Sequence, residues 1–256
     1  MEFLQSLLSK VPIHVLPMWY AISRTSDSII GSIIEKYLGT PKIYEKYLQE
    51  INFDDPILKK ISKDVFSAPN FTIEASQLRK KHRLSHENFE KYMLLLEYHL
   101  VCCLSYQPVK GGWQEVVTPF HEWKEYLCFL RDTEPEPIKE IDKIETLDFD
   151  KDSIPISERD LREIKRSLKR VSHLGWIYLE DFLRGFTAAI CETEPVALKS
   201  KGKRWKYAIP TYSQDEINLV QNILFGRLHS AGIVEIGTHR KKPCFCVTSY
   251  GRLSIE

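Results

Sequence analysis

The chain has 256 residues, of which 43% are hydrophobic and 28% are charged, and its formal net charge at pH 7 is +1. This composition is that of a folded protein with one or two domains, and it excludes a disordered or collagen-like chain. No apolar run reaches the length of a membrane span, and residues 1–17 lack the basic start of a signal peptide, so we expect no membrane partner.

The cysteines stand in apolar surroundings, and none of them belongs to a Cys-x-x-Cys motif. Because zinc sites need such closely spaced ligands, we interpret the cysteines as buried free thiols in a reducing compartment. We therefore expect a cytoplasmic protein with no metal and no other cofactor. The six cysteines are Cys102, Cys103, Cys128, Cys191, Cys244 and Cys246.

The first fifty residues predict short amphipathic helices. Apolar residues recur at steps of three and four in segments 3–8, 29–38 and 44–48. A further helix is expected from Asp55, with Pro56 in its first turn.

Residues 51–131 predict a first winged helix-turn-helix unit. The segment 72–83 predicts a short helix, Ser85 caps a second helix, and residues 101–107 and 113–120 predict a hairpin. A helix, a capped helix and a two-stranded wing follow each other in that fold. The alternative is a helical domain decorated by one hairpin.

Residues 132–156 predict an acidic linker. Pro135 and Pro137 disfavour a helix, and the residues between 132 and 152 include nine Asp or Glu against three Lys or Arg. A few apolar side chains in the linker can dock on a neighbouring surface: Ile141, Ile144, Leu147 and Phe149.

Residues 157–256 predict a second unit of the same kind. Ser157 restarts a helix with basic residues on its outer face, and a very apolar helix follows it. Ser213 and Glu216 form a capping box at the start of another helix. An alternating strand, a basic turn and a returning strand complete the pattern. An ordinary α+β hairpin corner is the alternative.

We therefore predict a mainly α-helical α+β protein with small β-hairpins, in which two winged helix-turn-helix units are joined by an acidic linker. The expected divisions are 1–131, 132–156 and 157–256. Residues 155–256 hold 17 Lys and Arg against 11 Asp and Glu, so the second unit is expected to be the basic one.

No catalytic motif accompanies these elements. Gly202-Lys203 is followed by Arg204, where a phosphate-binding loop needs serine or threonine. Glu122-Trp-Lys124 lacks the upstream metal-binding aspartate of a nuclease, and the histidines are scattered without ligand spacing. We expect a protein that is not an enzyme.

Positive charge interleaved with aromatic residues predicts DNA binding by the second unit. Lysine and arginine bind the phosphate backbone, and Trp205 can stack on a base, although a core position for Trp205 is the alternative. The candidate nucleic-acid-binding residues are Lys199, Lys201, Lys203, Arg204, Trp205, Lys206, Arg227, His239, Arg240, Lys241 and Lys242.

The two candidate recognition helices oppose sequence-specific reading of DNA. The first is expected to expose Glu87, Glu90 and Glu97, and the second begins with Asp215-Glu216. Acidic groups repel the phosphates that flank the major groove. The hypotheses are therefore DNA binding through backbone contacts and, as the alternative, a protein–protein adaptor that does not bind DNA.

Three successive stretches resemble the non-motor winged-helix region of bacterial XPB-type DNA helicases. They are SLLSKVPIHVLPMW with the helices after it, ILKKISKDVF…IEASQLRKKHRL…LLLEYHLVCCL, and GWIYLEDFLRGF…LHSAGIVEIGTHRKKPCFCVTSYGRL. The most literal part is the ending Thr248-Ser-Tyr-Gly251, where a hairpin strand runs into Thr-x-x-Gly. The resemblance implies contact with DNA or with a helicase. No motor is present, so the resemblance implies no catalytic residue.

Overall fold

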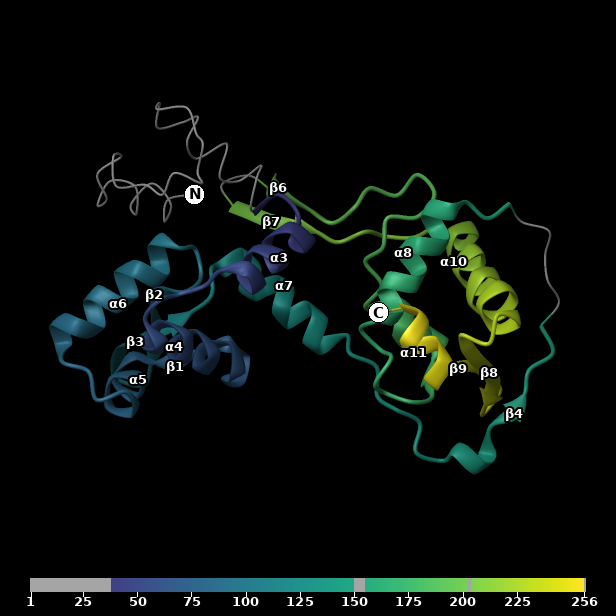
Figure 1. Cartoon of the computed structure of the whole chain (residues 1–256), viewed down its shortest axis with the longest axis horizontal. Coiled ribbons are helices and arrows are strands. Elements are labelled where there is room, and N and C mark those ends of the chain that lie inside the picture. Colours follow the sequence, from purple (N-terminus) through teal and green to yellow (C-terminus); the bar gives the residue numbers. More distant parts are fainter. Residues whose placement is uncertain (1–37, 150–154, 202–203, 256) are drawn as a thin grey trace. The chain divides into compact units, whose positions relative to one another are not determined.

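The structure is a computed structural model that describes residues 38–149, 155–201 and 204–255 (Figure 1). The helices expected at 3–8 and 29–38 lie outside the described residues, apart from Leu38. The protein is of the α+β class with small antiparallel sheets, which confirms this part of the predicted fold. None of the described helices is long and apolar enough to cross a bilayer.

The chain divides into two units that differ from the expected divisions. Unit 1 contains Met1–Cys128 and Ala197–Ala208, and unit 2 contains Phe129–Val196 and Ile209–Glu256. The basic segment 197–208, which was expected in the C-terminal unit, therefore belongs to unit 1.

The helices that begin in the described part of unit 1 follow the predicted order. Asp55 and Ser85 cap two of them, since their side chains accept hydrogen bonds from the backbone N–H groups of Ile57 and Asn88. The helices are α3 (Pro41–Glu50), α4 (Pro56–Ser67), α5 (Ala75–Lys81), α6 (His86–Tyr98) and α7 (His121–Asp132), with a 3-10 turn at Pro69–Phe71.

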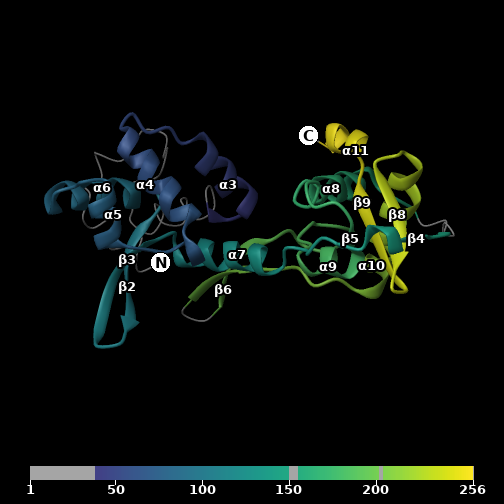
Figure 2. The same ribbon diagram turned by 90° about the horizontal axis from the view of Figure 1, so that it is seen from below.

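An antiparallel sheet of order β1-β3-β2 completes this part of unit 1, and its strands are β1 (Ile73–Glu74), β2 (Cys103–Val109) and β3 (Gly112–Thr118). β1 pairs only with Val116 and Val117 of β3. Among the described residues the turn end of the β2–β3 hairpin therefore has no third strand beside it, and Figure 2 shows this hairpin extending away from the described helices of unit 1.

Unit 2 has a four-stranded antiparallel sheet of order β4-β8-β9-β5. Its strands are β4 (Glu145–Thr146), β5 (Ile177–Tyr178), β8 (Val234–His239) and β9 (Lys242–Val247). Its helices are α8 (Glu158–Leu168), α9 (Leu179–Arg184), α10 (Gln214–Gln221), the π-helix η6 (Asn222–Leu228) and α11 (Ser249–Ile255), with a 3-10 turn η5 (Ile141–Lys143).

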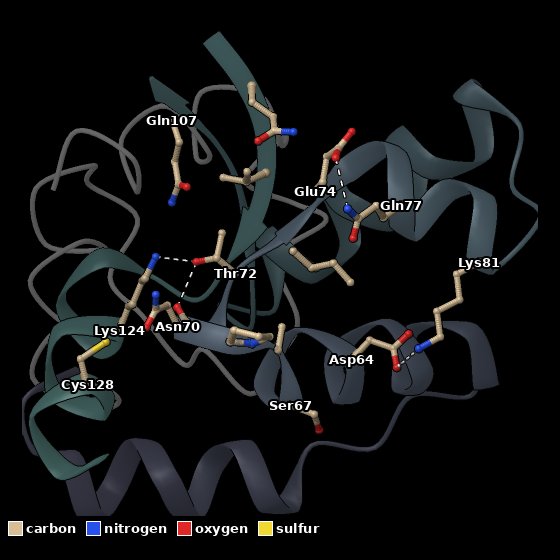
Figure 3. A pocket seen from close by; sticks show the side chains of 15 residues that line it. Asp64, Ser67, Asn70, Thr72, Glu74, Gln77, Lys81, Gln107, Lys124 and Cys128 are labelled. Atoms are coloured by element: carbon tan, nitrogen blue, oxygen red, sulfur yellow. Dashed lines mark hydrogen bonds and ion pairs between the residues drawn. The ribbon is translucent and has the colours of Figure 1, made fainter. Parts of the chain in front are cut away.

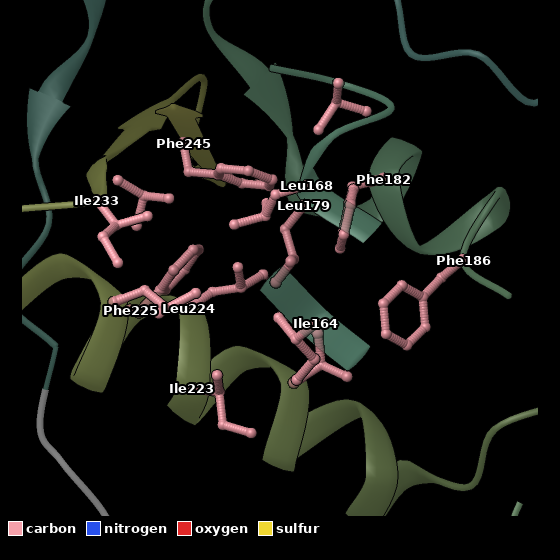
Figure 4. Packing of buried hydrophobic residues seen from close by; sticks show 14 of the residues in the cluster. Ile164, Leu168, Leu179, Phe182, Phe186, Ile223, Leu224, Phe225, Ile233 and Phe245 are labelled. Carbon is pink, nitrogen blue, oxygen red and sulfur yellow. The ribbon is translucent and has the colours of Figure 1, made fainter. Parts of the chain in front are cut away.

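Side chains from four elements of unit 2 converge on one core (Figure 4). Ile164 comes from α8, Phe182 from α9, Phe225 from η6 and Phe245 from β9, and each has at most 1% of its surface exposed. The rings of Phe182 and Phe245 meet edge to face with their centroids 5.4 Å apart. This packing joins the helices to the hairpin in one body.

The two units repeat one order of elements. Each has a helix, a two-residue strand, a short helix, a longer helix and a hairpin, namely α4-β1-α5-α6-β2-β3 and α8-β5-α9-α10/η6-β8-β9. In each unit the two-residue strand pairs with the second strand of the hairpin. In unit 2, residues 185–213 are inserted between the short helix and the longer one.

Residues 138–149 of the predicted acidic linker pack along unit 2, and Leu147 and Phe149 dock on its core as the sequence allowed, whereas Ile141 is 58% exposed. Ile138 is buried and its N–H donates to the carbonyl of Trp176 at 2.7 Å. β4 extends the sheet by pairing with β8. The Phe149 ring meets Phe225 edge to face at 5.6 Å. These apolar and backbone contacts outweigh the repulsion among the acids. Residues 138–149 are called the strap below.

All six cysteines are free, as predicted, but their burial differs from the prediction. Cys102, Cys103 and Cys244 are buried, whereas Cys191 is exposed. Cys191 also has a positive φ of 48° at the end of the segment that follows α9. The interpretation of all six as buried thiols is therefore wrong for Cys191.

Candidate nucleic-acid interface

The basic hairpin is made of β6 (Ala197–Lys201) and β7 (Arg204–Ala208), and one of its faces is anchored in unit 1. Leu198 and Tyr207 lie opposite each other in the register and pack on an aromatic cluster. The Tyr207 ring lies 5.3 Å from Tyr126 and 6.2 Å from Trp123, between centroids. Its hydroxyl donates to the carbonyl of Leu38 at 3.0 Å. Burial raises the pKa of Tyr207, so this hydroxyl keeps its proton.

The anchored hairpin changes the charge of both units. Segment 197–208 contains five Lys or Arg and no acid, whereas the charges of residues 1–128 balance. By sequence, unit 1 therefore carries a net charge of +5 and unit 2 carries −4. The C-terminal unit, which was expected to be basic, loses these five cations to unit 1.

Like charges oppose each other across the basic hairpin. Lys199 is paired in register with Lys206, and Lys201 with Arg204. Like charges directly opposite each other destabilise a strand pair. The charge of Lys206 is partly compensated, since its Nζ donates to Glu125 Oε1 at 3.0 Å while it stays 43% exposed.

Trp205 and Lys203 are the other candidates of this hairpin. Trp205 lies opposite Ser200 in the register and is half-buried. It is therefore neither fully in the core nor fully free to stack on a base. Lys203 lies outside the described residues.

His239 of the hairpin β8–β9 is not a surface group. Its side chain is 4% exposed, and its Nδ1 lies 2.5 Å from the hydroxyl of Tyr178. Its Nε2 is 3.5 Å from Glu140 Oε2, which is too long for a good hydrogen bond. The proposal that His239 contacts nucleic acid is therefore wrong, because β5 and the strap cover it.

Two of the three other cations of the hairpin β8–β9 face carboxylates. Arg240 and Lys241 have φ values of 53° and 63° and form the two-residue turn between β8 and β9. Arg240 Nη2 donates to Glu140 Oε2 at 2.8 Å, and Lys242 Nζ donates to Glu180 Oε1 at 2.6 Å. Lys241 is exposed.

Glu140 is the acid that binds this wing tip. Hydrogen bonds from Lys143 and then from Arg240 lower the pKa of Glu140 to about 2. The carboxylate thus stays ionised well below neutral pH. A phosphate that approached Arg240 would have to replace it.

The helix before this wing is largely covered too. Asn222 is buried. The strap residues Leu147 and Phe149 pack on the cluster that contains η6. Arg227 is half-exposed, and its Nη2 lies 3.5 Å from Glu158 Oε1.

The corresponding elements of unit 1 are open. α6 exposes His86, Glu87 and Lys91. Glu97, which was expected on the surface, is instead buried and accepts a hydrogen bond from the N–H of Leu104 at 3.0 Å. The wing of unit 1 exposes Tyr106 and Trp113, which the sequence did not single out.

A basic run was also missed at the turn between α5 and α6. Its exposed members are Lys80, Lys81 and Arg83. Lys81 and His82 both lie against Asp64 of α4, at 2.8 and 2.9 Å. The five-residue sequence RKKHR at 79–83 is a visible signal, but it was read only as part of a helix.

Unit 1 also has a polar cavity of about 860 Å³ on the face of its sheet that carries Gln107 and Gln114 (Figure 3). Lys124 Nζ donates to the hydroxyl of Thr72 inside it, at 2.5 Å. Burial lowers the pKa of Lys124. Amides and one partly desolvated ammonium can hold a polar ligand, but their arrangement names no reaction. Among the described residues no group of His, Cys, Asp and Glu could hold a metal ion.

The chain matches no family model, and it matches no curated protein.

Proposed function

We propose that this protein is a non-catalytic nucleic-acid-binding protein built from two winged-helix units. The repeated order of elements supports this interpretation, because a helix, a short strand, two helices and a hairpin make a winged helix-turn-helix. The proposed phosphate-binding surface is the hairpin β6–β7 on unit 1.

The observation that carries the proposal is the pair of like-charged cross-strand partners, Lys199 with Lys206 and Lys201 with Arg204. Segment 197–208 contains five Lys or Arg and no acid, so an anionic ligand would neutralise a dense positive charge there. A polyanion fits better than a single anion, since the cations follow one another along the ribbon and the whole unit has a net charge of +5.

The wing of unit 2 has a smaller part in this proposal. Arg240 and Lys242 already bind carboxylates, so phosphates gain less there. The candidate recognition helix of unit 1 has Glu87 in its first turn and exposes Glu87 and Glu90, which favours backbone contacts over base reading.

The test compares two triple alanine variants of the full chain. Lys199, Lys201 and Arg204 are replaced in one, which keeps the Lys206–Glu125 pair, and Arg240, Lys241 and Lys242 are replaced in the other. Affinity for duplex DNA is measured over a series of salt concentrations. Each lost phosphate contact lowers the slope of log K against log salt by about 0.9.

We expect the hairpin variant to lose about two to three units of slope and the wing variant to lose about one or less. Equal losses in both variants would show that the wing of unit 2 makes as many phosphate contacts as the hairpin β6–β7. Unchanged slopes in both would remove the hairpin from the interface.

The second candidate function is a winged-helix adaptor that binds a protein and no DNA. Tyr250 and Leu253 favour it, since they lie one turn apart on α11 with 63% and 75% of their surfaces exposed. The resemblance to the helicase-associated region would make a helicase one such partner. The adaptor function predicts no DNA affinity at about 50 mM salt, where phosphate binding is strong.

A further inference from the structure

Two large aromatic side chains stand on the hairpin β2–β3 of unit 1 without a partner in the core. Trp113 is 72% exposed and Tyr106 is 63% exposed. Exposed aromatic area of this size is unfavourable in water, and on a projecting hairpin it is typical of a binding surface.

The strand register places both rings on one face of the hairpin. Trp113 lies opposite Pro108, and Tyr106 lies opposite Glu115. Because successive residues of a strand point to opposite faces, Tyr106 and Trp113 are diagonal neighbours on one side, with Cα atoms about 7–8 Å apart. Gln107 and Gln114, which line the polar cavity, belong to the other side.

The Tyr106 ring is also held in place. Its hydroxyl donates to Glu115 Oε1 at 3.2 Å, and this hydrogen bond raises the pKa of Tyr106. The hydroxyl therefore keeps its proton, and its ring position is tied to the opposite strand. A fixed ring loses little conformational entropy when another planar group stacks on it.

The surroundings of the two rings suit nucleobases better than a protein. An interface with a protein needs an apolar core with several side chains, whereas the neighbours on this hairpin mix the charged Glu115 and Lys110 with the exposed apolar Pro108 and Val109. A base needs only a planar face, and its phosphates are attracted by the net charge of unit 1.

We infer that Trp113 and Tyr106 form a stacking platform for the bases of single-stranded nucleic acid. The inference rests on the proposed function and adds the class of ligand to it. The hairpin β6–β7 binds phosphates whether or not bases are present, whereas this platform binds bases that are free of a duplex partner.

The test uses two labelled probes of equal length and charge, an oligothymidylate and an abasic oligonucleotide with the same phosphates. We expect the wild-type chain to bind the thymidylate more tightly. Trp113→Ala should weaken thymidylate binding between about 5-fold and 150-fold for each base that is no longer stacked, and it should leave abasic binding unchanged. Trp113→Phe keeps a ring and should retain most of the affinity.

Tyr250→Ala is the matched control, because it removes an aromatic side chain of similar exposure from α11 of unit 2 and should change neither probe. A thermal melt of each variant excludes unfolding. If folded Trp113→Ala keeps the wild-type preference for thymidylate, the inference is wrong and a protein is left as the occupant of this face.

The outcomes for the inference and for the proposed function differ. If wild type binds both probes equally, and the variant with Lys199, Lys201 and Arg204 replaced by alanine binds both more weakly, phosphate binding stands and the base platform is wrong. If neither probe binds, the proposed function and the inference are both wrong.

Discussion

Glu140 and Arg240, one hundred residues apart in the chain, form an ion pair in which Arg240 Nη2 donates to Glu140 Oε2 at 2.8 Å. Glu140 lies at the start of the strap, and Arg240 lies at the tip of the wing of unit 2. The pair shows that the acidic segment binds the basic wing of its own unit. Arg240, one of the candidate nucleic-acid-binding residues, therefore already binds a carboxylate.

This pair gives a pH-dependent contribution to stability. Hydrogen bonds from Lys143 and then from Arg240 lower the pKa of Glu140 to about 2 from its ordinary value of 4.5. A lowered carboxyl pKa stabilises the fold above the unfolded pKa, and that contribution is lost as the pH falls through the folded value. Glu140→Gln should therefore lower the urea midpoint at pH 7, and the difference from wild type should shrink between about pH 4.5 and pH 2. A difference that grows towards acid would contradict this assignment.

The strap should be resistant to proteases. In place of the early cleavage expected of a loose linker, we expect the first cuts in wild type to avoid 138–149. Leu147→Ala with Phe149→Ala removes two apolar anchors and should destabilise unit 2 by about 2–4 kcal/mol. Mass spectrometry of the first fragments should then find cuts within the strap. First cuts within the strap of the wild-type chain would show that it is not docked.

The Tyr207 anchor should stabilise unit 1 rather than unit 2. Tyr207→Phe loses the hydrogen bond to the carbonyl of Leu38 and should cost about 1 kcal/mol. Tyr207→Ala also loses the ring contacts with Trp123 and Tyr126 and should cost about 3 kcal/mol. Amide hydrogen exchange locates the effect, which should appear in α3 and α7. Faster exchange confined to β8 and β9 would contradict the division of the chain.

Gly251 should not tolerate a side chain. A Cβ there would lie 2.1 Å from the carbonyl oxygen of Ile233. Its N–H also donates to Thr248 Oγ1 at 2.8 Å, which gives the Thr-x-x-Gly ending a physical reason. Gly251→Ala should destabilise unit 2 by at least about 2 kcal/mol. Gly232→Ala is the comparison, because open space surrounds that position and only its φ of +69° opposes a side chain. Equal melting temperatures for the two variants would refute the close approach.

The local elements were predictable from the sequence because their signals are local. Ser213 and Glu216 form the predicted capping box, and Ser85 and Ser157 cap their helices as expected. The pairing of Val234 with Val247 follows from the alternation of the two strands. Each of these signals needs only neighbours within a few residues.

The long-range contacts were not predictable in the same way. Nothing near Tyr207 in the sequence indicates that its ring packs on Trp123 and Tyr126, so the basic hairpin was assigned to the wrong unit. The apolar side chains of the strap were visible in the sequence, but the surface on which Leu147 and Phe149 pack was not. The segment Asn222–Leu228 is the π-helix η6 and not a regular α-helix, and Phe225 is buried in it.

The central claim is that the full chain binds the nucleic-acid backbone through the hairpin β6–β7. The most direct measurement is the affinity of the wild-type chain and of the Lys199→Ala, Lys201→Ala, Arg204→Ala variant for the same duplex between about 50 and 200 mM salt. The account predicts a steep fall of wild-type affinity with salt and a slope about two to three units shallower in the variant. Folded wild-type protein with no affinity at about 50 mM salt, or a variant with an unchanged slope, would contradict it.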